Sequence, residues 1–198
     1  MSKTIKFGLK NVHYAIVTET TTSGTTTSSY GTVKPWPGAV SLSMQASQDK
    51  TVFRADDSDY YVSYGEGQYT GTLETALIPE ELKKDLGWIK EDDNGVAVES
   101  SEDYKITKYV ALLFEFNNDE KASRHVFYKT SFSRADIAGQ TTGEGGTIEP
   151  QTETVNITAV PRADADRFIH AETGSSTGTT TYNNWYSTVY VPTFTPGG

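Results

Sequence analysis

The sequence predicts a mainly β protein, an antiparallel β-sandwich or a partly closed barrel with one packed α-helix. Thr, Ser, Gly and Tyr are abundant and long helical patterns are missing, which favours strands joined by turns. Polar and apolar residues alternate along residues 40–47 and 69–77, a period typical of strands. The 198 residues are expected to form a single domain, residues 1–198, with roughly eight or nine short strands.

The clearest pattern lies within residues 38–79. The first strand there places apolar side chains on one face and a polar series on the other. A later strand, residues 69–77, repeats this arrangement. The two polar series are Ser41, Ser43 and Gln45, and Thr70, Thr72 and Glu74. They lack Lys and Arg, so each forms either an ordinary solvent face or a wall past which a polyanion slides without sticking.

Between these strands the chain is expected to turn twice. A break at Gln48-Asp49-Lys50 precedes a short strand over residues 51–54. The acidic residues Asp56, Asp57 and Asp59 then turn the chain, with carboxylates capping backbone N–H groups. The same acids could instead form the carboxylate pair of a glycosidase. Acids in one loop rarely hold the separation which that chemistry requires, so the turn is favoured.

Residues 79–87 give the best helix signal in the chain. Pro79 lies in the first turn, acids follow it, bases come later and Gly87 ends the segment. Leu82 and Leu86 are spaced i, i+4 and form the expected buried face.

Further strands are expected elsewhere. The segment over residues 109–117 is apolar on both faces, which predicts either burial on both sides, or burial on one side and an intersubunit contact on the other. An Asn94-Gly95 turn predicts a small hairpin. The remaining strands are expected over residues 11–19, 124–132, 152–160 and 185–194.

Three segments rich in Thr, Ser or Gly are expected to be flexible loops. They are residues 18–32, 133–151 and 172–184. Such segments bury too little apolar surface to fix themselves in the free chain.

Composition excludes several functions. The chain has 17 Lys and Arg residues and 26 Asp and Glu residues, which gives a formal charge of -9. It is therefore a poor candidate for binding nucleic acid. The chain has no cysteine, which excludes disulfides, thiolate metal sites and a Cys nucleophile. No apolar run approaches the ~18 residues of a membrane span, and the N-terminus lacks the apolar region of a signal peptide.

Catalytic motifs are also missing from the sequence. It contains no phosphate-binding loop, nucleophile elbow, zinc-protease motif or dinucleotide fingerprint. The histidines His13, His125 and His170 are scattered along the chain. We therefore expect no enzyme activity, cofactor or metal.

Several segments resemble the major tail protein, or tail tube protein, family of long, non-contractile-tailed bacteriophages of Gram-positive hosts. The resemblance is a pattern of strands and turns that covers most of the chain. The matching pieces are NVHYAIVTE (11–19), WPGAVSLS (36–43), FRADDSDYY (53–61), GQYTGTLETALIPEEL (67–82), DLG (85–87) and TETVNITAVPR (152–162).

The resemblance implies a structural virion protein that is made in the host cytoplasm. It would assemble into hexameric rings stacked into a tube with a negative lumen, through which DNA passes during ejection without specific binding. Tape-measure, tail-terminator and baseplate proteins are the other implied partners. Family members often carry an appended immunoglobulin-like domain, and none is expected within residues 1–198.

In such a tube, the polar series Ser41, Ser43, Gln45, Thr70, Thr72 and Glu74 would line the lumen. The turns between the two strands would contact neighbouring subunits or rings. Their expected contact residues are Asp49, Lys50, Asp56, Asp57 and Asp59.

Two other functions are compatible with the sequence. The 12 tyrosines and three tryptophans could form the sugar-stacking face of a carbohydrate-binding β-sandwich module. A glycosidase that uses Asp56 and Asp59 is the second alternative.

Overall fold

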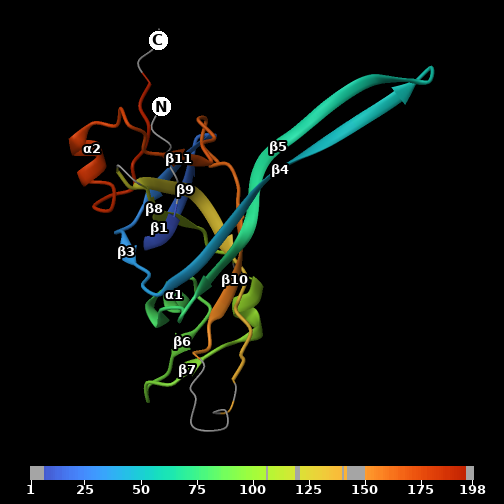
Figure 1. Ribbon diagram of the computed structural model, residues 1–198. Coiled ribbons are helices and arrows are strands. Elements are labelled where there is room, and N and C mark those ends of the chain that lie inside the picture. The colour runs from blue at the N-terminus through green and yellow to red at the C-terminus, as the bar shows by residue number, and fades with distance from the viewer. Residues whose placement is uncertain (1–6, 106, 119–120, 140, 142–149, 195–198) are drawn as a thin grey trace.

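A large antiparallel sheet runs through the protein in the computed structural model (Figure 1). The structure describes residues 7–105, 107–118, 121–139, 141 and 150–194. The main sheet has nine strands in the order β2-β1-β8-β9-β10-β5-β4, with β3 paired to β1 and β11 paired to β9. Because β2 and β4 stand at its two ends, the sheet does not form a closed barrel.

The strands of this sheet vary widely in length. The short ones are β2 (Thr25–Tyr30), β3 (Lys34–Pro35) and β11 (His170–Glu172). The intermediate ones are β8 (Val110–Asn117), β9 (Ser123–Phe132) and β10 (Glu153–Ala159). The longest are β1 (Phe7–Thr22), β4 (Ala39–Ala55) and β5 (Ser58–Thr75). A separate two-stranded sheet pairs β6 (Lys90–Glu91) with β7 (Ala97–Val98).

Strand β8 is the centre of the hydrophobic core. Its side chains from Val110 to Phe114 are all buried, and they alternate between two apolar clusters on opposite faces of the sheet. Leu112 and Phe114 join the first cluster, while Ala111 and Leu113 join the second. The predicted burial of this strand on both sides is therefore confirmed, and its predicted hairpin with β9 is also confirmed.

Helix α1 (Glu80–Asp85) covers the first cluster. Glu80 and Glu81 lie in its first turn, Lys83 and Lys84 in its last, and Leu82 and Leu86 are buried, as the sequence predicts. The chain leaves the helix at Gly87, whose φ of 72° favours glycine. The predicted Asn94-Gly95 turn joins β6 to β7 and is also confirmed.

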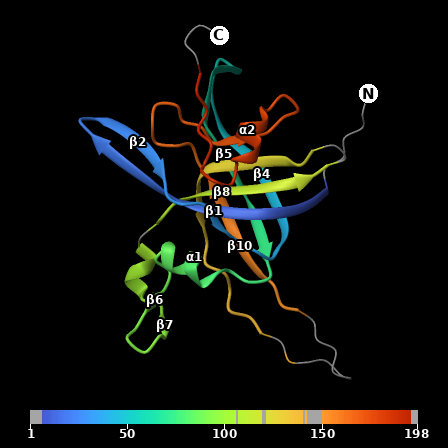
Figure 2. The ribbon, with the colours of Figure 1, turned by 90° about the vertical axis from the view of Figure 1, so that its left-hand side faces the viewer.

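The chain after β11 covers the second cluster. Trp185 and Val189 are buried there against β8 and β9. A short helix, α2 (Thr179–Asn183), precedes them, and Figure 2 shows it close to β8. The predicted strand over residues 185–194 is wrong, because these residues form turns and irregular backbone. The predicted loop over residues 172–184 is wrong in part, because α2 lies within it.

Polar residues extend two strands further than expected, which makes one prediction wrong and another correct only in part. Residues 18–32 do not form an irregular loop. The end of β1 pairs with β2 from Val17↔Tyr30 to Thr22↔Thr25, and the hairpin projects from the body in Figure 2. The expected break at residues 48–50 is a register shift in the β4–β5 pairing between Gln48 and Lys50, while β4 itself continues from Ala39 to Ala55.

Part of the third predicted loop, residues 133–151, lies outside the described residues. Of its described part, residues 133–139 contain no helix or strand, in agreement with the prediction. A 3-10 helix, Ser101–Lys105, completes the secondary structure of the described chain.

Candidate functional site

A polar surface extends across strands β4, β5 and β10. Antiparallel pairing aligns residues of the three strands in rows, so that side chains of one row point to the same side of the sheet. The rows are Ser41–Glu74–Thr154, Ser43–Thr72–Asn156 and Gln45–Thr70–Thr158. We call these side chains the polar face. The two polar series predicted from the sequence therefore share one surface.

The polar face is open to solvent. Ser43, Gln45, Thr70, Thr72 and Asn156 are all exposed. The apolar residues between them turn to the other side of the sheet, where Leu73, Val155 and Ile157 are buried in the first cluster. Core packing thus fixes which side of each strand the polar residues occupy.

Glu74 is the one charged residue in these rows. Its carboxylate accepts hydrogen bonds from Ser41 Oγ at 3.0 Å and from Thr152 Oγ1 at 2.7 Å. These contacts hold the carboxylate over the outer strands of the sheet. No described residue in the three rows is a Lys or Arg, so the surface presents hydroxyl and amide groups and one negative charge.

Strand β10 contributes a third of this surface, although no functional role was predicted for it from the sequence. Thr154, Asn156 and Thr158 alternate with buried Val155, Ile157 and Ala159. The same alternation that singled out Ser41–Gln45 was present in this segment. Its place beside β5 was not predictable, because roughly 80 residues separate the two strands.

A long hairpin arm extends β4 and β5 beyond the sheet. The arm comprises residues 49–65 and projects from the body in Figure 1. At its base, Gln48 Nε2 donates to the Gly65 carbonyl at 2.9 Å and joins the two strands to each other, while Glu66 forms an ion pair with Arg167 of the body at 2.5 Å. Beyond the base, the strands pair with each other from Lys50↔Tyr64 to Ala55↔Ser58.

The acidic residues of this region do not lie in one loop, which corrects the sequence-based expectation. Asp49 and Lys50 lie within β4, and Asp59 lies in β5, where it pairs with Arg54 at 3.1 Å. Asp56 and Asp57 alone form the turn, with φ of 52° and 59°. A two-residue turn with positive φ at both positions matches the twist of a hairpin, and Asp tolerates that conformation.

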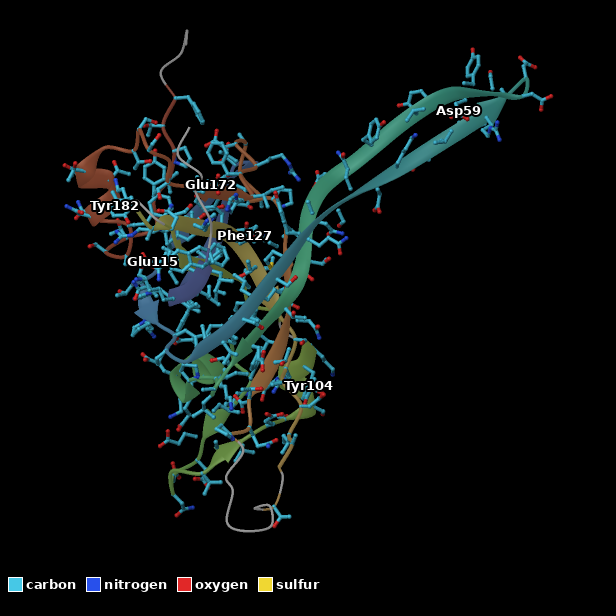
Figure 3. The ribbon with its side chains drawn as sticks, in the orientation of Figure 1. Asp59, Tyr104, Glu115, Phe127, Glu172 and Tyr182 are labelled. Carbon is cyan, nitrogen blue, oxygen red and sulfur yellow. The ribbon has the colours of Figure 1, made fainter. Side chains whose placement is uncertain are left out.

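The expected capping role of these carboxylates is also revised. The side-chain hydrogen bond described at this turn runs from Ser58 Oγ to the Ala55 carbonyl, at 3.1 Å. The three acids are exposed at the outer end of the ribbon, where Asp59 is labelled in Figure 3.

Exposed apolar side chains cover both sides of the arm. Phe53 is 59% exposed and faces Tyr61, which is 60% exposed, across the ribbon. Val52 faces Val62 on the other side, and both are also exposed. The side-chain ring contacts of the arm stay within the ribbon, as in the edge-on contact of Phe53 with Tyr60. A two-stranded ribbon in water is only marginally stable by itself, so this surface is suited to a contact with another chain.

The chain matches no known protein family and no curated protein. Among the described residues, the helices are too short to cross a membrane.

Proposed function

We propose that the protein is the subunit of a phage tail tube, assembled from hexameric rings that stack in the virion and let DNA pass during ejection. The proposal rests on the resemblance of the sequence to the tail tube family, since the comparisons with known proteins add no support. The observation that carries it is the polar face, which combines hydroxyls and amides with one carboxylate and no cation.

The chemistry of the polar face suits the inner wall of such a tube. DNA carries one phosphate charge per strand every ~3.4 Å, so Lys or Arg on a channel wall would retain it. Uncharged polar groups keep the wall wet without binding phosphate, and the Glu74 carboxylate repels it. The excess of 26 acidic over 17 basic residues in the whole chain acts in the same direction.

The arm supports self-assembly. Apolar side chains on both sides of the ribbon are exposed to water in an isolated subunit, whereas burial against a neighbour would stabilise a ring or a stack. Asp49, Lys50, Asp56, Asp57 and Asp59 lie along this arm or at its end and belong to the proposed contact surface. The curved sheet with its covering helix would then serve as the partly closed, sandwich-like domain of a tube subunit.

Electron microscopy of the purified protein tests the assembly. Negative-stain images are expected to show rings or tubes, and light scattering is expected to rise with protein concentration. A protein that stays monomeric at high concentration in the presence of tail initiator proteins would overturn the proposal. Glycan binding by that monomer would favour the carbohydrate-binding alternative instead.

Cysteine labelling tests which surface lines the lumen. The chain contains no cysteine, so Ser43→Cys and Asn156→Cys each introduce a single reactive thiol. Both thiols should react with a small maleimide in the assembled tube but be shielded from a large polymer-linked maleimide. The same variants before assembly are the control and should react with both reagents. Equal reaction with the large reagent in tubes would show that the polar face lies outside the lumen.

A further inference from the structure

Three side chains with metal-binding groups meet where β11 pairs with β9. The register places Glu172 opposite His125 and His170 opposite Phe127. Residues that face each other across two strands lie on the same side of the sheet, and so do residues two apart in one strand. His125, His170 and Glu172 therefore project from one side. Up to 47 positions separate these residues in the sequence, from 125 to 172, so no local sequence pattern indicates the cluster.

The distances within this cluster match the spacing of ligands around a zinc ion. His125 Nδ1 lies 3.1 Å from His170 Nε2 and 3.3 Å from Glu172 Oε2. One ligand atom from each residue lies within 4.8 Å of the other two. Bonds of ~2.0–2.1 Å in a tetrahedral site place neighbouring ligand atoms roughly 3.3 Å apart. Only small side-chain adjustments are therefore needed to accommodate the ion.

His125 is held in place by its surroundings. The side chain is buried, and its ring stacks on Phe114 with the ring centroids 5.1 Å apart and an interplanar angle of 5°. Its second ring nitrogen, Nε2, lies 3.0 Å from Ser123 Oγ. A partner on the second nitrogen fixes the orientation of a metal-binding imidazole and directs the other nitrogen toward the metal.

The cluster opens onto a pocket of about 470 Å³ between β4 and β9. All three residues line this pocket together with apolar side chains such as Met44, Tyr69 and Phe127. Glu172 reaches solvent, and Figure 3 shows it at the end of the body above Phe127. A metal ion could therefore enter from solvent, and a water or small ligand could complete its coordination from the pocket.

We propose that His125, His170 and Glu172 bind one divalent transition-metal ion of the zinc class. Two imidazoles and one carboxylate form a ligand set that zinc accepts, with the fourth position filled from the pocket. The ion would tie β11 to β9 just before the segment that covers the second core cluster. The site would thereby stabilise the docking of the C-terminal part of the chain, independently of the proposed tube.

Metal titration of the full chain tests the site. The purified protein is stripped with a chelator and titrated with Zn²⁺ in competition with a chromophoric chelator, and then with Co²⁺, whose visible absorption reports tetrahedral coordination. One equivalent of metal is expected to bind and to raise Tm. His170→Ala and Glu172→Gln should each weaken binding at least tenfold and remove the gain in Tm. Glu172 is exposed, so Glu172→Gln spares the core, whereas His170 is partly buried with its ring centroid 4.7 Å from that of Phe127. The Tm of each metal-free variant is therefore the reference for its own gain.

His13→Ala is the matched control, because His13 lies on β1 outside the cluster and should not affect metal binding. The 3.1 Å distance between His125 Nδ1 and His170 Nε2 is also compatible with a direct hydrogen bond between the two imidazoles, without a metal ion. A chain that holds only this hydrogen bond would bind no stoichiometric Zn²⁺, and that result would overturn the proposal. Binding that persists unchanged in His170→Ala, or that is lost in His13→Ala, would also overturn it.

Discussion

Tyr14 donates a hydrogen bond from its hydroxyl to Asp85 Oδ2 at 3.0 Å and thereby joins β1 to helix α1. The same carboxylate oxygen accepts from Lys34 Nζ at 2.6 Å. Tyr14 itself is 1% exposed, in the first core cluster. A charged acceptor thus holds the end of the helix against the sheet, in addition to the apolar contacts of Leu82 and Leu86.

Tyr14→Phe is expected to lower the free energy of unfolding by about 1–3 kcal/mol, because it removes a hydrogen bond to a charged group and leaves that group with one donor fewer. Urea unfolding measures the change. Tyr104→Phe is the matched control, since the exposed Tyr104 hydroxyl donates to exposed Glu99 at 3.1 Å, and its loss should cost less than about 0.5 kcal/mol. Equal effects of both substitutions would contradict the role given to Tyr14.

Stability is expected to fall at alkaline pH because two buried tyrosines and two partly buried ones have a raised pKa in the folded protein. Burial raises the pKa of Tyr14, Tyr30, Tyr128 and Tyr186 well above the ordinary value of 10.0. Well below pH 10 these groups are neutral in both the folded and unfolded states and contribute no pH dependence. As pH rises above about 10, the unfolded chain ionises first, so unfolding becomes more favourable.

Thermal unfolding followed from pH 8 to pH 12 measures this loss, together with tyrosinate absorbance. Tm should stay nearly constant up to about pH 9.5 and then fall. Tyr14→Phe should reduce the slope of the fall, since one of the four groups no longer ionises on unfolding. A Tm that is independent of pH over the whole range would contradict the burial of these hydroxyls.

Local sequence patterns were sufficient to predict the helix and the central hairpin. The signals for helix α1 lie within a few residues of one another, so the sequence predicts the helix. They are Pro79, the order of acids and bases, and Gly87. The apolar run of β8 requires burial on both sides wherever the strand lies. The alternation in residues 40–47 likewise fixed which side chains share a face, although not which strand lies next to them.

The wrong predictions arise where strand pairing, or packing of a segment against the core, outweighs the local amino-acid composition. Residues 18–32 lack apolar alternation, yet Thr favours strands, and β1 provides a template with which β2 pairs. The polar residues 48–50 continue β4 because the arm is exposed on both sides and needs no apolar face. Trp185 and Val189 suggested a strand, but they cover the second cluster from irregular backbone. The His125–His170 contact depends on long-range pairing, which no local pattern shows.

Gly71→Ala is expected to destabilise the sheet by about 1–3 kcal/mol, measured by urea unfolding. A Cβ at Gly71 would lie 1.8 Å from the Ser43 carbonyl oxygen and 2.8 Å from Met44 Sδ, so the β4 backbone would have to move. Gly67→Ala is the control in the same strand, since its Cβ would meet only Ile169 Cδ1, at 3.9 Å. Similar losses in the two variants would mean that the close approach of β4 does not explain the cost at Gly71, because strand propensity alone favours Ala over Gly.

The arm is expected to serve assembly and to contribute little to the stability of the subunit. The double substitution Phe53→Ser and Tyr61→Ser removes a facing aromatic pair whose rings are more than half exposed. Because neither residue packs on the core, the free energy of unfolding of the monomer should change by less than about 0.5 kcal/mol per substitution. The concentration needed for assembly should rise at least tenfold, since the apolar surface proposed to meet a neighbouring subunit is lost.

Sedimentation velocity and negative-stain microscopy measure this effect. Tyr104→Ser is the control, because it removes an exposed aromatic side chain on the 3-10 helix, away from the arm, and should leave assembly unchanged. If the double variant assembles at the same concentration as the unmodified protein, the arm is not the contact surface. If it unfolds more easily as a monomer, the aromatic residues of the arm stabilise the subunit itself, and the separation of the arm from the core proposed above is wrong.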